Sequence, residues 1–300
     1  MYSCTLCPRE CGSDRDRSGS SFCGESRSVT VSRAMLHMWE EPSISGERGS
    51  GAIFFCGCSL RCVFCQNKTI SRGGGARREL SKEKLESLML RLRDAGAHNI
   101  NLVTPTHFAD TLARVLEKIK PTLDIPIIYN TSGYEKVETL RMLEGLVDVY
   151  LPDFKYASSE LAKRYSNAFD YPLVAQKALG EMYRQTGEAV FDENGMIKRG
   201  VIIRHLLLPS HRKDSMEVLD RIAEAVPVEK VRLSLMSQYT PEFALDCEYK
   251  NLHRRVTSFE YSSVLDYAVS LGFEGYFQER SSASDSFTPN FNDGDMLKNI

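Results

Sequence analysis

The sequence predicts an α/β fold, a partial (β/α)6 TIM-like barrel preceded by a small cysteine-rich module. Short apolar strands alternate with helical patterns from residue 52 to residue 271. Strands that are apolar throughout belong to a parallel sheet covered on both faces. Six strand–helix units fit in this span, which favours a barrel over a doubly wound sheet. No Gly-x-Gly-x-x-Gly follows the first strand, which weakens a dinucleotide-binding alternative.

The expected elements follow one another in order. Residues 1–50 form the cysteine-rich module, with a short strand at 29–31 and few apolar residues for a core. The barrel occupies residues 51–272, and Ser81 caps its first helix, which Gly96 ends. The polar residues 273–300 are expected to form a tail or lid. Barrel strands are expected at 52–55, 99–103, 125–129, 147–151, 201–208 and 231–235, and helices at 82–95, 112–119, 137–146, 158–187, 216–225 and 259–271.

Composition is typical of a globular chain and excludes several classes of protein. Of the 300 residues, 42% are apolar and 26% are charged, and the formal net charge is −2. So small a charge provides no positive field for nucleic acid or anionic lipid. No apolar run approaches the roughly 20 residues that a membrane span needs, and the first residues lack the pattern of a signal peptide. We therefore expect a cytoplasmic protein without nucleic-acid or membrane partners.

Cysteine is the unusual component, because eight of the nine cysteines fall within the first 65 residues. A chain of this size needs no disulfides and shows no export signal, so we expect a reducing compartment and metal ligands. The first four have the spacing Cys4-x2-Cys7-x3-Cys11-x11-Cys23, and four thiolates close a tetrahedral site. This site could hold zinc, a single iron or a second cluster for electron relay. Free or disulfide-linked thiols are the alternative.

The next three cysteines have the spacing Cys58-x3-Cys62-x2-Cys65 and begin where the first barrel strand stops. That end of a βα barrel is where active sites are built. A zinc ion would need a fourth ligand from elsewhere, whereas a four-iron cluster on three thiolates keeps one iron open for substrate. The alternative is one buried face of a helix, but Gly57 and Arg61 interrupt such an apolar face. The two remaining cysteines are interpreted as buried thiols, Cys56 and Cys247.

The three-cysteine motif with an aromatic residue before its last cysteine resembles the radical SAM superfamily. The surrounding sequence is similar to homologues of pyruvate formate-lyase activating enzyme, the PflX-like branch. This similarity rests on His37–Pro42, Ser45–Gly51, Gln66-Asn67 and Gln278–Ser284, and extends to Cys-Pro-Arg-x-Cys in the first cysteine group. The chain lacks the eight extra cysteines that activating enzymes with ferredoxin-like clusters carry. Their absence argues against an activase of that type.

The resemblance implies a cofactor set and a chemistry. Cys58, Cys62 and Cys65 would each ligate one iron of a [4Fe-4S] cluster, and S-adenosylmethionine (SAM) would chelate the fourth. An electron from a donor such as ferredoxin or flavodoxin would cleave SAM to a 5′-deoxyadenosyl radical, which takes a hydrogen atom from the substrate. The protein supplies orientation and a dry site. Phe64, in the aromatic position of the motif, would pack near the adenine.

Residues at the other strand ends complete the expected SAM site. Thr104 stands where many relatives carry a Gly-Gly-Glu that binds the methionyl amine, and this chain departs from that pattern. Asn130 and Ser132 suit a ribose or carboxylate, although a simple turn is the alternative. Asp153-Phe154-Lys155 resembles the Asp-Leu-Lys of the activating enzymes, whose acid and lysine contact SAM. A surface ion pair is the alternative reading of this pair.

Two further positions are weaker candidates for cofactor binding. Arg204 and His205 are neighbours in a strand, so only one of them can point into the barrel. The sequence favours His205, with a satisfied structural pair as the alternative. Gln238 follows the sixth strand and is a candidate of the same kind.

Three functions remain open from the sequence. The first is a radical SAM enzyme that installs a glycyl radical on, or otherwise oxidises, a protein partner. The second is a radical SAM enzyme that acts on a small molecule or another macromolecule. The third is a non-enzymatic zinc protein that binds partners, for which the near-neutral charge argues against nucleic acid. No motif in the sequence identifies the substrate.

Overall fold

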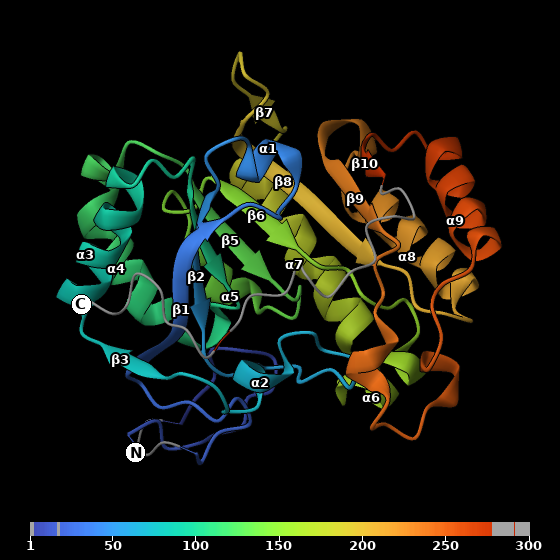
Figure 1. Ribbon diagram of the computed structural model, residues 1–300, viewed down its shortest axis with the longest axis horizontal. Helices are drawn as coiled ribbons and strands as arrows, with labels where there is room; N and C mark the ends of the chain where they lie inside the picture. Colours follow the sequence, from blue (N-terminus) through green and yellow to red (C-terminus); the bar gives the residue numbers. More distant parts are fainter. Residues whose placement is uncertain (1–2, 17–18, 278–290, 292–300) are drawn as a thin grey trace.

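The computed structural model describes residues 3–16, 19–277 and 291, and the chain folds around one large sheet (Figure 1). Ten strands contribute, and nine lie side by side in the order β10-β9-β8-β6-β5-β4-β2-β1-β3. Neighbours from β2 to β10 run parallel, which confirms the α/β class and the partial barrel. These parallel strands are β2 (Ser50–Phe55), β4 (Ile100–Val103), β5 (Ile127–Thr131), β6 (Val149–Pro152), β8 (Ile197–Leu206), β9 (Arg232–Met236) and β10 (Gly275–Phe277).

Helices cover the outer face of the sheet. In Figure 1, α3 and α4 lie at its left end and α8 and α9 lie at its right end. Ser81 accepts a hydrogen bond from the backbone of Lys84 and so caps α3, as its sequence position predicts. Thr257 and Glu260 form a capping box at the start of α9. The helices are α3 (Lys82–Asp94), α4 (Ala109–Leu123), α5 (Val137–Arg141), α6 (Ser159–Ser166), α7 (Tyr171–Thr186), α8 (Arg212–Ala225) and α9 (Ser258–Ser270), with short α1 (Pro42–Ser45) and α2 (Lys68–Ser71).

Alternation along the strands divides the core into two layers. Ile128, Val149, Leu151 and Ile202 pack together on the concave face of the sheet. Residues of the opposite parity pack against the helices; Tyr129 and Ile203 are examples. Burial on both faces explains why these strands are apolar throughout.

Four strands of the described residues lie outside the predicted set of barrel strands: β1, β3, β7 and β10. β1 (Val29–His37) is longer than the strand expected at 29–31 and pairs antiparallel with β2. It therefore joins residues on the two sides of the boundary expected at residue 50. β3 (Arg78–Leu80) pairs antiparallel with β1, and β7 (Val190–Phe191) pairs antiparallel with β8.

The C-terminal part differs in one respect from the expected tail. Gly275–Phe277 form β10, which pairs parallel with β9 and begins inside the segment expected as tail or lid. Of the residues beyond 277 the structure describes Phe291 alone, so Gln278–Ser284 lie outside the described part of the chain. Phe291 is buried against Phe54 on the concave side of β2.

None of the helices in the described residues is long and apolar enough to cross a membrane.

Two glycines with positive φ offer a matched test of the fold. Gly133 (φ 76°) follows β5, and a Cβ there would overlap the carbonyl oxygen of Asp153, whereas Gly145 (φ 77°) has open space around it. We expect Gly145→Ala to lower the free energy of unfolding by about 1 kcal/mol, from backbone strain alone. Gly133→Ala should lower it by about 3 kcal/mol or more, because the clash adds to the strain. Urea unfolding measures both, and equal losses would contradict the close approach of these two loops.

Candidate active site

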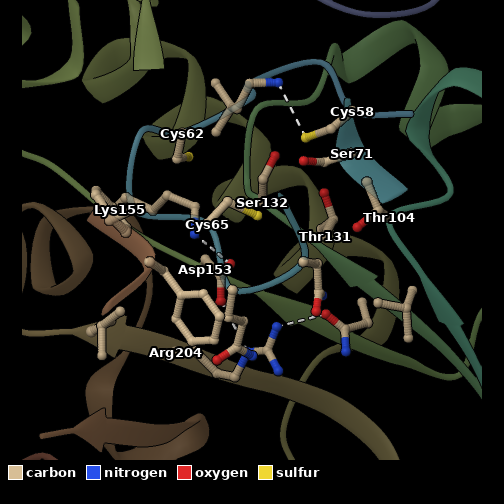
Figure 2. Close-up of a pocket in the computed structure, with 18 of the residues that line it drawn as sticks. Cys58, Cys62, Cys65, Ser71, Thr104, Thr131, Ser132, Asp153, Lys155 and Arg204 are labelled. Carbon is tan, nitrogen blue, oxygen red and sulfur yellow. Dashed lines mark hydrogen bonds and ion pairs between the residues drawn. The ribbon is translucent and has the colours of Figure 1, made fainter. Parts of the chain in front are cut away.

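A cavity of about 220 Å³ opens at the carboxyl ends of the parallel strands. Five strand ends contribute to its lining through the loops that follow them: Cys58 after β2, Thr104 after β4, Ser132 after β5, Asp153 after β6 and Gln238 after β9. Figure 2 shows the three cysteines of the first loop gathered on one side of this cavity, with Arg204 on the other. Residues far apart in the sequence therefore meet at the edge where βα barrels place their active sites.

The loop after β2 places three sulfur atoms in the cavity. Cys58 and Cys62 are buried and Cys65 is half-buried. Gly57 and Arg61 both have positive φ, 82° and 53°, which turns the loop back over the strand ends.

Each of these sulfurs accepts a hydrogen bond. The backbone N–H of Leu60 donates to Cys58 Sγ (3.3 Å). The Ser166 hydroxyl donates to Cys62 Sγ (3.0 Å), and the Ser71 side chain bonds to Cys65. Donors aimed at sulfur favour the thiolate, which is the form that binds metal.

Burial opposes ionisation of two of these thiols, Cys58 and Cys65, in the absence of a positive partner. It raises the pKa of Cys65 to about 12, with further contributions from Cys62 and Cys58. It likewise raises the pKa of Cys58, and the charge of Lys155 lowers that pKa only in part. Three thiolates can therefore coexist here only when a cationic centre compensates their charge, as a metal cluster does.

Arg204 is the central charge on the opposite wall. Its guanidinium donates to Asp153 Oδ1 (3.0 Å), Glu40 Oε2 (3.2 Å) and Asn130 Oδ1 (2.6 Å). Lys155 Nζ bonds to the other Asp153 oxygen at 2.7 Å. These contacts join the ends of β5, β6 and β8 to the loop after β1.

The environment sets the charges of this network. Burial would raise the pKa of Asp153, but the charges of Lys155 and Arg204 outweigh it and hold the pKa below its ordinary value. Burial raises the pKa of Glu40, and Arg204 and Asn101 offset this only in part. Asp153 is therefore the more firmly ionised of the two acids.

The structure corrects one orientation expected from the sequence. Arg204, not His205, points into the cavity, since Arg204 shares its face of β8 with Ile202 on the concave side. His205 points the other way, and its Nδ1 lies 2.7 Å from the Phe154 carbonyl oxygen. Burial lowers the pKa of His205 to about 4, which keeps the imidazole neutral.

The other predicted site residues of the barrel line the cavity together. Glu40 and Ser71 also line the cavity, and no sequence pattern predicts a role for either of them. Glu40 lies in the loop between β1 and α1, and a loop has no hydrophobic periodicity from which the direction of its side chains could be predicted. The predicted residues that line the cavity are Cys58, Cys62, Phe64, Cys65, Thr104, Asn130, Ser132, Asp153, Lys155 and Gln238.

Thr104 and Phe64 show how the backbone and the aromatic residues shape the cavity. Thr104 has a φ of 60°, a conformation that is an outlier for a β-branched residue, and its N–H donates to the Asn130 carbonyl oxygen. Such strain is characteristic of functional sites. Phe64 packs edge-on against Tyr156, Tyr165 and Tyr239, so its position at the cavity is firmly held.

Comparisons with known proteins agree with this arrangement. Residues 52–187 match the Radical SAM superfamily. The chain is 30% identical over 274 residues to the uncharacterized protein MJ0674 of Methanocaldococcus jannaschii, covering 88% of this chain and 74% of that protein. The chain belongs to the radical SAM superfamily. Its membership implies an enzyme with a [4Fe-4S] cluster and SAM, and enzymes of this superfamily generally need a reductant such as flavodoxin or ferredoxin.

The comparison with solved structures gives more distant matches. One match is Streptococcus suis SuiB bound to its precursor peptide SuiA, with 15% sequence identity and a TM-score of 0.49. The match covers 74% of this chain and 46% of the SuiB chain. Against methylornithine synthase (PylB) the identity is 16%, the TM-score 0.46, and the coverage 79% of this chain and 67% of that one.

The first cysteine group lies beside the loop that carries Cys58, since the Cys23 carbonyl oxygen would lie 2.7 Å from a Cβ on Gly57. Burial raises the pKa of Cys7 to about 12, and the neighbouring Cys23, Glu135 and Cys4 add to it. Cys11 is exposed and accepts hydrogen bonds from Ser13 and from the Phe22 backbone. The four cysteines are therefore brought to one region of the N-terminal segment.

Arg204 gives a test of the charge network. Arg204→Met would leave the largely buried Glu40 without its ion-pair partner and Asp153 with Lys155 alone, so we expect the free energy of unfolding to fall by about 3 kcal/mol. The pKa of Glu40 would then lie still further above its unfolded value. A carboxyl with a raised pKa in the folded chain loses stability as pH rises, so the loss should be larger at pH 8 than at pH 5.

The double variant Arg204→Met/Glu40→Gln supplies the control, because it removes the uncompensated charge. It should be more stable than Arg204→Met alone at pH 8 in urea unfolding. Strictly additive losses would show that the two side chains do not interact.

Proposed function

We propose that this radical SAM enzyme ligates its [4Fe-4S] cluster through Cys58, Cys62 and Cys65 and abstracts hydrogen from a protein partner, as an activating-type enzyme does. The observation that supports this proposal is one cavity lined both by three sulfurs and by the Asp153–Lys155 pair. This pair stands where activating enzymes have the Asp-Leu-Lys that contacts SAM. With the cluster and SAM bound, the site would supply one-electron cleavage of SAM and hydrogen abstraction by the 5′-deoxyadenosyl radical.

The chain's own side chains would bind and orient SAM. Lys155 would bind the methionyl carboxylate, because its ammonium is paired with only one Asp153 oxygen and lies in the field of Cys62. The hydroxyl of Ser132 and the amide of Asn130 would hold polar groups of SAM beside Thr104. Phe64 would offer its held ring to the adenine, and the surrounding aromatic side chains would exclude water. Gln238 lines the cavity and would offer a further polar contact, whereas His205 lies outside the cavity.

The alternative is a radical SAM enzyme that modifies a small molecule or another macromolecule. Its support is the polar wall of Arg204, Glu40 and Asn130, which would recognise a compact substrate with hydrogen-bonding groups.

We further propose the division into residues 1–50, 51–272 and 273–300, with a second metal site at Cys4, Cys7, Cys11 and Cys23. Reduced ferredoxin or flavodoxin would supply the electron.

A matched pair of cysteine variants tests the cluster. Cys58→Ala should lose the iron and sulfide of the cluster and all 5′-deoxyadenosine formation after anaerobic reconstitution. Cys56→Ala, two residues earlier and outside the cavity lining, should keep both. Iron and acid-labile sulfide analysis with a SAM cleavage assay measures this. Zinc without iron or sulfide in the parent protein would instead support a non-enzymatic zinc protein.

The class of substrate needs a separate experiment. The reconstituted enzyme, with SAM and reductant, should generate the EPR doublet of a glycyl radical when it is mixed with its protein partner. Screening glycyl radical enzymes from the same genome is the direct test. A lack of signal with all of them, together with 5′-deoxyadenosine that depends on a small molecule, would favour the alternative.

A further inference from the structure

Eight of the nine cysteines divide into two kinds by what their sulfurs do. In the cavity, Cys58, Cys62 and Cys65 accept hydrogen bonds from backbone or hydroxyl donors. Cys56 behaves as an ordinary buried thiol, since its sulfur donates weakly to the Ala76 carbonyl oxygen at 4.0 Å. The proposed cluster ligands thus have sulfur atoms that accept hydrogen bonds. The same property can be used to ask whether the N-terminal cysteines are also metal ligands.

All four N-terminal sulfurs meet this criterion. Ser13 Oγ donates to Cys11 Sγ (3.2 Å). The Ser21 hydroxyl lies 3.2 Å from Cys23 Sγ but donates its proton to the Glu25 carbonyl oxygen, so the donor to Cys23 is a backbone group. The backbone N–H of Arg9 donates to Cys7, and the backbone of Glu25 bonds to Cys23. Cys4 Sγ accepts from a guanidinium nitrogen of Arg15 at 3.8 Å.

Arg15 strengthens the case for anionic sulfur at this place. Its side chain is only 6% exposed, and its other terminal nitrogen donates to the Ser26 carbonyl oxygen. Its Nε is buried without a hydrogen-bond partner in the described part of the chain. A buried guanidinium needs a nearby negative charge, and thiolates at Cys4 and Cys23 would supply it.

The ligand set suits a cluster, because four cysteine thiolates are the usual ligands of [2Fe–2S] and [4Fe–4S] clusters. Four thiolates also close a structural zinc site, but zinc has no redox chemistry. The position of the group beside the cavity loop is therefore what favours a cluster.

The N-terminal group touches the cluster loop directly. The Cys23 carbonyl oxygen would lie 2.7 Å from a Cβ on Gly57, the residue before Cys58. Arg9 Nε donates to the Ser59 carbonyl oxygen at 2.8 Å, while its guanidinium stacks on Phe22 at 4.1 Å. A short path through covalent bonds and packed atoms therefore connects Cys23 with Cys58.

Exposure gives this path a direction. Cys11 is exposed to solvent and Cys4 is half-buried, whereas Cys7 and Cys23 are buried. An external donor could therefore reach the Cys11 side, and the Cys23 side faces the cavity loop.

We propose that Cys4, Cys7, Cys11 and Cys23 hold a second iron–sulfur cluster that relays electrons to the cluster at Cys58, Cys62 and Cys65. A reduced one-electron donor protein is oxidised by one electron, the N-terminal cluster is reduced and then reoxidised, and the cavity cluster is reduced by the same electron. The existence of the N-terminal cluster is independent of the proposed function, and its relay role rests on that function.

The first experiment tests the cluster without any SAM chemistry. The variant Cys58→Ala/Cys62→Ala/Cys65→Ala, reconstituted anaerobically, should retain iron and acid-labile sulfide in equal amounts, with an EPR signal on reduction. Zinc without sulfide, or no metal, would overturn the proposal. Because this variant could fold poorly, the parent and Cys11→Ser are compared in parallel. Cys11→Ser should lose the N-terminal iron and sulfide only, and an unchanged content would also overturn it.

The second experiment tests the relay. Cys11 is exposed, so Cys11→Ser should leave the cavity intact, and SAM should still shift the EPR spectrum of the cavity cluster. SAM cleavage driven by titanium(III) citrate should stay within about twofold of the parent, and cleavage driven by reduced flavodoxin should fall by about tenfold or more. Cys247→Ser is the matched control and should match the parent with both reductants. Equal losses with both reductants, or no loss with flavodoxin, would overturn the relay.

Discussion

The mouth of this barrel is assembled around one buried guanidinium. Arg204 donates to Asp153, Glu40 and Asn130, and so ties the ends of three parallel strands to the loop that follows β1. Buried ions are tolerated only when they are paired and hydrogen-bonded. The loops therefore have little freedom to separate, and the groups that face the cavity (Lys155 and the three sulfurs of the cysteine loop) keep a defined relation to one another.

The order of strands and helices and the cysteine motif could be predicted because their signals are local. A short apolar strand, a Ser81 cap and a Cys-x3-Cys-x2-Cys spacing each lie within a few residues. Which of Arg204 and His205 points into the cavity could not be predicted. Alternation along a strand places the two side chains on opposite faces but does not say which face is concave. Glu40 reaches the site from the loop after an antiparallel strand. β10 has only three residues, and it is a strand because it pairs with β9, which no local sequence pattern predicts.

Sulfur environments carry information that spacing does not. The cysteine count alone left zinc, iron and free thiols open for the N-terminal group. Hydrogen bonds at Cys4, Cys7, Cys11 and Cys23, together with the buried charge of Arg15, distinguish these four from Cys56. Donors to sulfur stabilise the thiolate and tune the reduction potential of a bound cluster. The same reasoning applies wherever cysteines crowd beside a radical site.

An open barrel, unlike a closed one, leaves two strands whose outer backbone groups have no partner in the sheet. Within the described part of the chain these strands are β3 and β10, and each has only three residues. Exposed Arg78 and Glu79 occupy β3, which places opposite charges along that edge. Short and charged edges resist pairing with another molecule. The chain can thus keep its barrel open beside the cavity without offering a template for aggregation.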